Sequence, residues 1–331
     1  MQLTQKKCRR GDLLTAAAVA MLLAVMAALL YTGSLTRQVT NMLIPTAVYI
    51  VMAVSLNLVV GLLGELSLGH AGFMSVGLFS GCLVAIALTN TALPLMVRLP
   101  VSMLAGGLTA AVFGLLVGLP TLRLRGDYLA IVTLACGEII KNIITNLRVT
   151  GGALGLNTTV IYAGAKELLP YGAALVLLTV AVMLNLKRSK YGRAIMAIRD
   201  NRIAAESVGL SVTRYKLAVF VIAAFFAGCA GVLYGHSLAN IKAAAFDYNM
   251  SIEILVIVVL GGMGSVPGSV VSAIVLTVLP EALREVADYR MLVYAVVLIL
   301  VMQATNNSAM KRFFGAACKS LTPKRKERAA L

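Results

Sequence analysis

Long apolar runs alternate with short polar connections along most of the 331-residue chain. A helix needs about 20 apolar residues to cross the hydrocarbon core of a membrane, and most of the runs approach or reach that length. The pattern therefore predicts an all-α, polytopic membrane protein with about ten transmembrane helices. The predicted segments are 13–31, 43–60, 66–88, 100–119, 128–147, 168–186, 217–236, 252–262, 269–283 and 289–303.

Three parts of the chain follow from this pattern: a basic segment over 1–11, a transmembrane domain over 12–305 and a basic tail over 306–331. The first apolar run is longer than the hydrophobic region of a typical signal peptide, so we expect it to remain as a span. The run 252–262 would give only about 16 Å of helix. Either two short helices meet after it near the inner face, or the chain dips into the membrane and returns.

The composition restricts the classes of protein to which the chain can belong. Hydrophobic residues make up 60% of the chain and charged residues 13%, whereas soluble domains have roughly 45–50% and about 25%. These values exclude a disordered chain, a fibrous rod and a small disulfide scaffold. Metal-ligand spacing is absent from the cysteines, which are expected to be free thiols, and no metal or cofactor is expected. They are Cys8, Cys82, Cys136, Cys229 and Cys318.

The net charge of +16 would suggest nucleic acid in a soluble protein. Here most of the 29 lysines and arginines fall on one side of the predicted spans when the N-terminus is placed inside. Cytoplasmic loops of membrane proteins carry such an excess. We therefore expect both termini in the cytoplasm, with the basic residues facing anionic lipid and no nucleic acid bound.

Catalytic signatures are missing from the sequence. His70 and His236 are isolated, and the glycine-rich run 261–268 is not followed by the Lys-Ser/Thr pair of a Walker A motif. The chain is therefore not expected to be an enzyme. Active transport would draw its energy from an ion gradient or from a partner.

The longest internal polar stretch, 187–216, is predicted to contain a short amphipathic helix. Asp200 or Asn201 would cap its N-terminus and Gly209 would end it. Such a helix would suit docking into a groove of a partner protein, and the alternative is a solvated loop. One face would carry a small, mainly apolar set: Ile203, Ala204, Ser207 and Val208.

Four blocks of sequence resemble, in order, the LivM-type permeases of branched-chain amino acid ABC importers. They are Ser55–Phe73, Leu124–Gly152, Gly192–Gly209 and Leu260–Gly268, and the resemblance covers about residues 41–300. It implies the ABC-importer permease fold and the import of leucine, isoleucine and valine by alternating access. It also implies a cytoplasmic coupling segment within 187–216 that contacts an ATPase. The matching coupling residues are Gly192, Arg199, Asn201, Ala204, Ala205 and Gly209.

The resemblance further implies a heteromeric importer in the bacterial cytoplasmic (inner) membrane. Its other parts would be a second homologous permease, two ATP-binding cassette ATPase subunits and an extracytoplasmic substrate-binding protein. ATP hydrolysis would then be supplied in trans. A urea or short-chain amide importer stays open, because such permeases share these blocks. An ion-coupled secondary transporter and a passive channel are the remaining classes.

Polar residues within or between the predicted spans are candidates for the translocation pathway. They are Asn57, Glu65, Ser67, His70 and Glu138. If Ser67 begins a half-helix, its free N–H groups would attract a carboxylate substrate. The alternative is a tight interior turn in which Glu65 and His70 are hydrogen-bonded.

Glu138 and Lys141 lie one turn apart on a predicted span. A lone charge at the bilayer centre is costly, so the pair must face protein or a cavity. It would be either a wall of the pathway or a structural ion pair or interhelical hydrogen bond at an interface between permeases.

Glycines in the predicted spans fall into two groups. Small residues one turn apart, such as Gly77 with Gly81, predict close helix packing, either inside the chain or at a seam with another subunit. The glycines near 262 form either a hinge used in gating or a plain tight turn. The hinge candidates are Gly261, Gly262 and Gly264.

Overall fold

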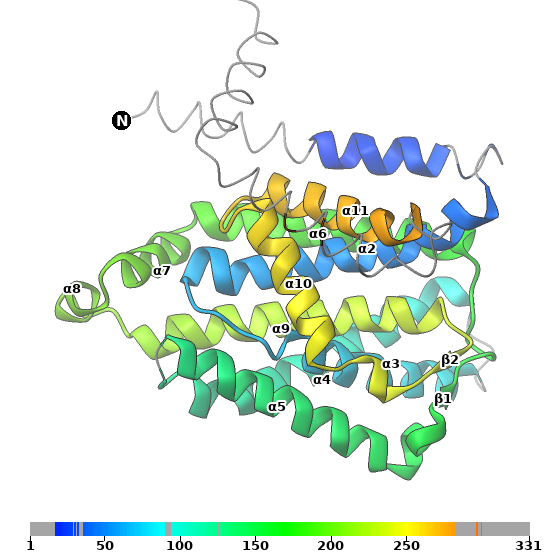
Figure 1. The fold of residues 1–331 in the computed structure, drawn as a ribbon, viewed down its shortest axis with the longest axis horizontal. Coiled ribbons are helices and arrows are strands. Elements are labelled where there is room, and N and C mark those ends of the chain that lie inside the picture. Colours follow the sequence, from blue (N-terminus) through cyan, green and yellow to red (C-terminus); the bar gives the residue numbers. More distant parts are fainter. Residues whose placement is uncertain are drawn as a thin grey trace, which may run out of the picture. The chain divides into compact units, whose positions relative to one another are not determined.

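The computed structural model describes residues 17–28, 30, 32, 36–89, 94–124, 126–282, 296 and 299. The chain divides into one unit over 1–278 and another over 279–331, and nearly all described residues belong to the first. Helices dominate this unit (Figure 1).

The long helices are the segment Ala17–Ala28, α2 (Arg37–Asn57), α3 (His70–Thr89), α4 (Leu95–Thr121), α5 (Asp127–Asn146), α6 (Ala165–Arg188), α9 (Val212–His236), α10 (Tyr248–Gly261) and α11 (Val266–Ala282). Shorter elements are the π-helix η1 (Leu58–Leu63), the 3-10 turns η2 (Arg148–Thr150), η3 (Gly152–Leu154) and η4 (Ala243–Ala245), the helices α7 (Lys190–Asp200) and α8 (Arg202–Ser207), and the strands β1 (Leu156–Asn157) and β2 (Asn240–Ile241).

Seven helices among the described residues are long and apolar enough to cross a membrane. Each matches a predicted segment, and the predicted segments 13–31 and 269–283 form the shorter apolar helices Ala17–Ala28 and α11. The segment 252–262 belongs to a longer candidate span, Ala243–Gly261, because η4 and the first turn of α10 precede it. The segment 289–303 lies outside the described residues apart from 296 and 299. The total of about ten spans therefore stays a prediction.

Helix α9 lies at the centre of this unit and packs against α2, α3 and α4. Glycines allow this close approach, since a Cβ atom on Gly77 of α3 would overlap the Cα atom of Gly228 of α9. Internal packing of the small residues was predicted and is confirmed. The free thiols of Cys82 and Cys229 are buried in the same core.

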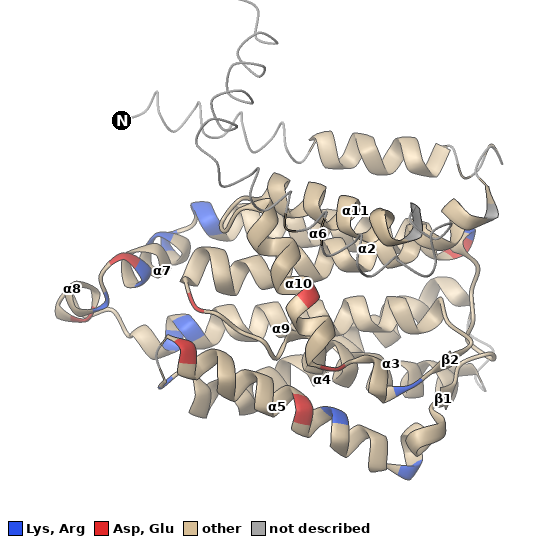
Figure 2. Cartoon of the chain, in the orientation of Figure 1, with Lys and Arg blue, Asp and Glu red and all other residues tan. Residues whose placement is uncertain are grey.

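Charged residues gather at the end of the unit that carries α7 and α8, as Figure 2 shows. There α7 and α8 connect α6 to α9, and the tight turn between α10 and α11 contacts the end of α6 through Lys187. Helices α10 and α11 thus meet at this end through the turn that contains Gly262 and Gly264.

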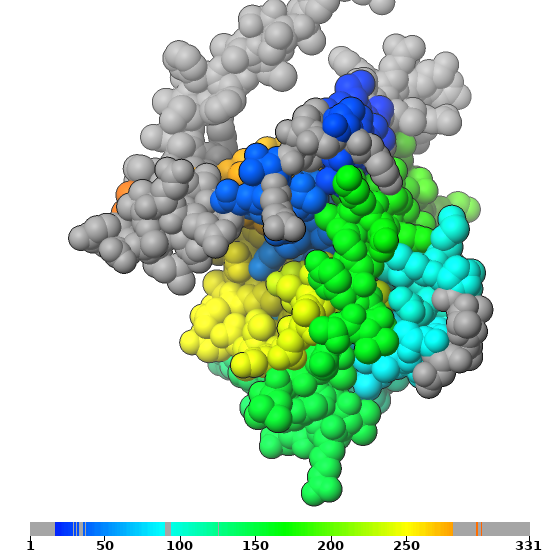
Figure 3. All heavy atoms as spheres, turned by 90° about the vertical axis from the view of Figure 1, so that its right-hand side faces the viewer, coloured from blue at the N-terminus to red at the C-terminus, as the bar shows by residue number. Residues whose placement is uncertain are grey.

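The opposite end is formed by the connections before α6 and after α9. Strand β1 pairs with β2 in antiparallel register, with Leu156 opposite Ile241. Figure 3 looks at this end and shows the two connections, in green and yellow, side by side. The pairing fixes both connections to one another.

The chain is not continuously helical between α2 and α3. Helix α2 passes into η1, Gly64 adopts a left-handed conformation (φ 77°), and an irregular segment follows. Helix α3 then begins at His70, within the predicted segment 66–88, and no half-helix begins at Ser67. Non-helical backbone inside a membrane protein is tolerated where other protein groups surround it.

Candidate coupling and pathway sites

The polar stretch 187–216 folds into two helices rather than one. Helix α7 was not predicted, although Ser189 provides a capping signal: its Oγ accepts a hydrogen bond from the Gly192 N–H at 3.0 Å. Gly192 is buried, and a Cβ atom there would overlap the Leu186 carbonyl oxygen. Gly192 therefore shapes the junction of α6 and α7.

The predicted helix over 202–208 is present as α8. Asn201, rather than Asp200, caps it, since Asn201 Oδ1 accepts from the Ala204 N–H at 3.1 Å. At its end, the N–H groups of Gly209 and Leu210 donate to the carbonyls of Glu206 (3.0 Å) and Ala205 (3.1 Å). With Gly209 at φ 86°, these two bonds form a Schellman motif.

The two sides of α8 have different surroundings. The predicted face is exposed, with exposed fractions of 80% for Ile203 and 81% for Val208. Ala205 instead is buried against Ile198 and Val212. Ala205 therefore packs α8 against α7 and α9 and does not lie on the exposed face of α8.

Arg199 connects the end of α7 to the end of α2. Its Nη1 donates to the Gly61 carbonyl at 3.0 Å, and its Nε and Nη2 donate to Asp200 Oδ1 at 3.2 and 3.1 Å. The Arg199 stem packs on Gly64, where a Cβ atom would lie 2.5 Å from Arg199 Cγ. Arg199 thus fixes α7 to the π-helical end of α2.

Asn57 fixes the turn between α10 and α11. Its Oδ1 accepts from the Gly264 N–H at 2.8 Å, and its Nδ2 donates to Ser269 Oγ at 2.8 Å and to the Ser265 carbonyl at 3.2 Å. Lys187 Nζ donates to the Gly264 carbonyl at 2.9 Å. Asn57 is fully buried, so in this conformation it joins helices and does not face a passage.

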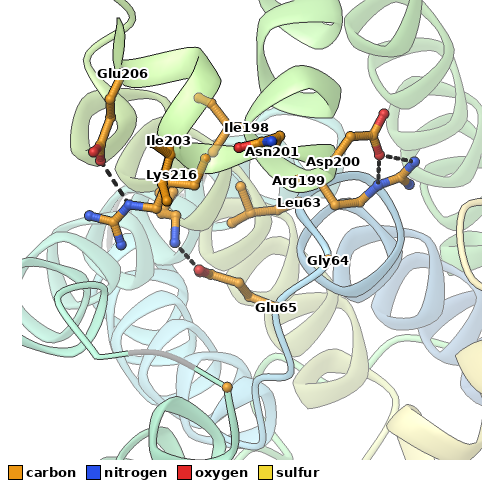
Figure 4. Close-up of a pocket in the computed structure, with 12 residues that line it drawn as sticks. Leu63, Gly64, Glu65, Ile198, Arg199, Asp200, Asn201, Ile203, Glu206 and Lys216 are labelled. Carbon is orange, nitrogen blue, oxygen red and sulfur yellow. Dashed lines mark hydrogen bonds and ion pairs between the residues drawn. The ribbon is translucent and has the colours of Figure 1, made fainter.

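A cavity of about 490 Å³ lies between the α2–α3 connection, α7, α8 and Lys216 of α9, with Gly126 of the α4–α5 connection also at its wall (Figure 4). Glu65 and Lys216 form an ion pair at its wall, with side-chain exposed fractions of 13% and 6%. The second carboxylate oxygen of Glu65, Oε2, is buried without a hydrogen-bond partner among the described residues. Both residues were visible in the sequence, but nothing in the pattern indicated a contact across 151 positions.

The start of α3 is surrounded by protein groups. His70 Nε2 lies 2.8 Å from Ser55 Oγ, and the Ala71 N–H donates to Ser251 Oγ at 3.2 Å. The Leu68 N–H donates to Thr133 Oγ1 at 3.1 Å. These contacts favour the interior-turn alternative over a carboxylate site. Ser67 Oγ is buried and has no hydrogen-bond partner in the described part of the chain.

Glu138 and Lys141 form the predicted ion pair on α5, with side-chain exposed fractions of 26% and 18%. Glu138 Oε1 also accepts from the Tyr248 N–H at 2.9 Å. Tyr248 is the first residue of α10, where a carboxylate is favoured by the helix dipole. The pair therefore has a structural role in joining α5 to α10, while one side of it remains open.

Comparison with known proteins shows the family to which the chain is related. Residues 38–302 match the family model of the branched-chain amino acid transport system permease component. Permeases named LivM, of high-affinity branched-chain amino acid transport systems, are 36% identical in Salmonella typhimurium and 37% identical in Escherichia coli. Each alignment covers 78% of this chain and 66% of the relative, so the chain spans just under two thirds of their length.

A Salmonella typhimurium permease named LivH, described as part of a high-affinity branched-chain amino acid transport system, is 31% identical over 125 residues, or 37% of this chain and 40% of the relative. No solved structure matches. The family match covers most of the chain, and seven helices can span a membrane. The chain is therefore a multi-pass membrane protein and belongs to the family of branched-chain amino acid transport system permease components.

Proposed function

We propose that this chain is a membrane-spanning subunit of an ABC importer for leucine, isoleucine, valine or close relatives. The names of the LivM relatives support the substrate class. The observation that carries the mechanism is the exposed, capped helix α8, held between α6 and α9 and linked through α7 to the end of α2.

In this proposal the energy comes from partners. Two ATP-binding cassette subunits hydrolyse ATP and receive the Ile203 and Val208 face of α8 in a groove. A second, homologous permease completes the membrane part, and an extracytoplasmic binding protein delivers the substrate. Both termini and the α7–α8 segment lie on the cytoplasmic side.

Coupling proceeds from α8 to the spans. Closure of the ATPases displaces α8, and the α7–α8 segment moves with it because Ala205 and Ile198 pack in one cluster. Arg199 passes this displacement to Gly61, and Lys187 passes it to Gly264. The turn with Gly261, Gly262 and Gly264 then acts as a hinge, and the permease alternates between inward and outward access.

The substrate route runs past the cavity at Glu65 and the open side of Glu138. The ion pair between Glu65 and Lys216 closes the inner end in the conformation described, because it bridges the α2–α3 connection and α9. Asn57, Ser67 and His70 position the walls of this route without contacting the substrate.

Uptake by proteoliposomes tests the proposal. The chain is reconstituted with its cognate permease, ATPases and binding protein, and ATP-dependent accumulation of labelled leucine is measured. We expect competition by unlabelled isoleucine and valine and none by urea or acetamide. Competition by urea alone would favour the amide importer, and accumulation by the chain without ATPases would overturn the ABC mechanism.

A further inference from the structure

Two of the spans present exposed stripes with the same spacing and different chemistry. On α4 the stripe is purely aliphatic: Val97, Val101, Leu104, Leu108, Val112, Leu115 and Leu119. On α5 it is Tyr128, Ile131, Ala135, Ile139, Asn142 and Asn146. In both, residues recur every three or four positions, so each stripe occupies one side of its helix.

The α5 stripe contains polar groups at membrane depth. Asn142 is exposed on it, and Glu138 with its partner Lys141 borders it near the middle of the span. Figure 2 shows acidic and basic residues together midway along α5. Lipid chains offer no hydrogen-bond partner to an amide or a carboxylate, so a lipid-facing position would be unfavourable for them.

Helix α5 also buries less of itself within this chain than any other of the seven candidate spans, with 28% of its most apolar window buried. Its uncovered side carries Ala135 at the centre, flanked by Ile131 and Ile139. A small residue such as Ala135 lets the backbone of a neighbouring membrane helix approach closely.

We propose that the α5 stripe is the seam with the second permease subunit, whereas the α4 stripe faces lipid. This inference rests on the proposed function for the existence of that subunit. The chain resembles both a LivM and a LivH permease of branched-chain amino acid systems in Salmonella typhimurium. A partner of the same family would carry its own α5 at the same depth. Packing of the two permeases along this stripe would remove Asn142 from lipid, and the substrate route past the open side of Glu138 would run along the same seam.

Photo-crosslinking in the assembled importer tests the seam at two matched positions. Benzoylphenylalanine replaces Ile139 or Leu108, whose exposed fractions of 57% and 60% are nearly equal. We expect a covalent adduct with the second permease from position 139, identified by mass spectrometry, and none from position 108. The proposal would be overturned if position 139 formed adducts only with lipid or with a second copy of this chain. Adducts with the second permease in equal yield from position 108 would overturn it as well.

Tryptophan substitution gives a second, independent measurement. Ala135→Trp places a large side chain at the centre of the seam, and Leu108→Trp places the same side chain in lipid. We expect the ratio of second permease to this chain after purification to fall at least about fivefold in the first variant and to stay unchanged in the second. An unchanged ratio for Ala135→Trp would contradict the seam. Because neither measurement depends on transport, failure of the proposed function would show separately, in uptake by the unsubstituted importer.

Discussion

The backbones of Gly61 and Gly264 touch at the junction of α2 with the turn between α10 and α11. A Cβ atom on Gly61 would overlap both the Gly264 amide nitrogen and Asn57 Oδ1. Each glycine is also held by a cationic side chain from α6 or α7: Lys187 donates to the Gly264 carbonyl and Arg199 to the Gly61 carbonyl. The junction is thus the point at which the end of α6 and the end of α7 contact two separate parts of the transmembrane unit.

Gly61→Ala is expected to destabilise this junction. The new methyl group meets backbone and a fully hydrogen-bonded amide, neither of which can move freely, and overpacking of this kind costs about 1–3 kcal/mol. We expect a lower melting temperature in detergent and reduced ATP-dependent uptake. Gly164→Ala is the matched control, because nothing lies within 4 Å of the added atom. Equal melting temperatures for the two variants would show that α2 and the turn can separate.

Lys187→Met is expected to uncouple hydrolysis from transport. The methionine keeps the length of the side chain and removes the bond to the Gly264 carbonyl, so displacement of the end of α6, to which α7 is joined, no longer reaches the turn through this contact. We expect uptake per ATP hydrolysed to fall about tenfold while the ATPases still copurify.

Two variants accompany this measurement. Lys187→Arg keeps a donor and should restore most of the uptake. Lys190→Met removes an exposed lysine nearby and should behave like the unsubstituted chain. Normal uptake by Lys187→Met would exclude this contact from the coupling route.

Removal of one partner from the Glu65–Lys216 pair is expected to be strongly destabilising. Lys216→Met would leave a buried carboxylate without its cation, which costs about 3–5 kcal/mol. The double variant Glu65→Gln/Lys216→Met should recover much of this loss, since no uncompensated charge remains.

The exposed pair of Arg202 and Glu206 provides the comparison, because surface pairs contribute only about 0–1 kcal/mol. Thermal unfolding of the single and double variants of both pairs measures the difference. Similar losses for Lys216→Met and Arg202→Met would contradict a buried pair at the cavity.

Changes on the outer face of α8 should separate docking from folding. Ile203→Asp or Val208→Asp places a charge on a side chain that is about four-fifths exposed, so the melting temperature should change little. Copurification of the ATPases should be lost, because the apolar face no longer fits a groove. Ala205→Asp on the buried side should instead lower the melting temperature. Retained ATPase binding by both outer variants would contradict docking through this face.

Asn201→Ala tests the cap of the same helix. It removes the acceptor for the Ala204 N–H, which costs about 1 kcal/mol of helix stability. We expect transport to be lost while membrane insertion is retained. Normal uptake by this variant would mean that α8 need not be preformed.

Local signals made much of the fold predictable. Asn201 and Gly209 bound α8 as expected, because capping and a left-handed glycine depend only on neighbouring residues. The apolar runs likewise predicted the spans, since length and hydropathy suffice for that. Helix α7 was missed because its composition is polar and its burial comes from tertiary contacts of Ile195 and Ile198.

Long-range contacts set the limit of prediction at the candidate sites. Asn57 is a pathway candidate by its polarity alone, and only the fold shows that its amide joins α2 to residues more than 200 positions away. Glu65 and Lys216 were each polar residues near the end of a span, and only the fold pairs them. Helix α3 begins at His70 rather than at Ser67, and Thr133 of α5, distant in sequence, binds the backbone of Leu68 just before it.

Thiol labelling tests the predicted orientation of the whole chain. Cys8 and Cys318 lie outside the described residues, in the basic segments assigned to the cytoplasm by their lysines and arginines. A membrane-impermeant maleimide should modify them in inverted vesicles and leave them unmodified in intact spheroplasts. Buried Cys82 and Cys229 should stay unmodified in both preparations, and replacement of the half-buried Cys136 by Ser leaves the termini as the source of any signal. Labelling of either terminal cysteine in intact spheroplasts would show that this end of the chain lies outside the cytoplasm. For Cys8, it would also place the α7–α8 segment on the side away from any cytoplasmic ATPase.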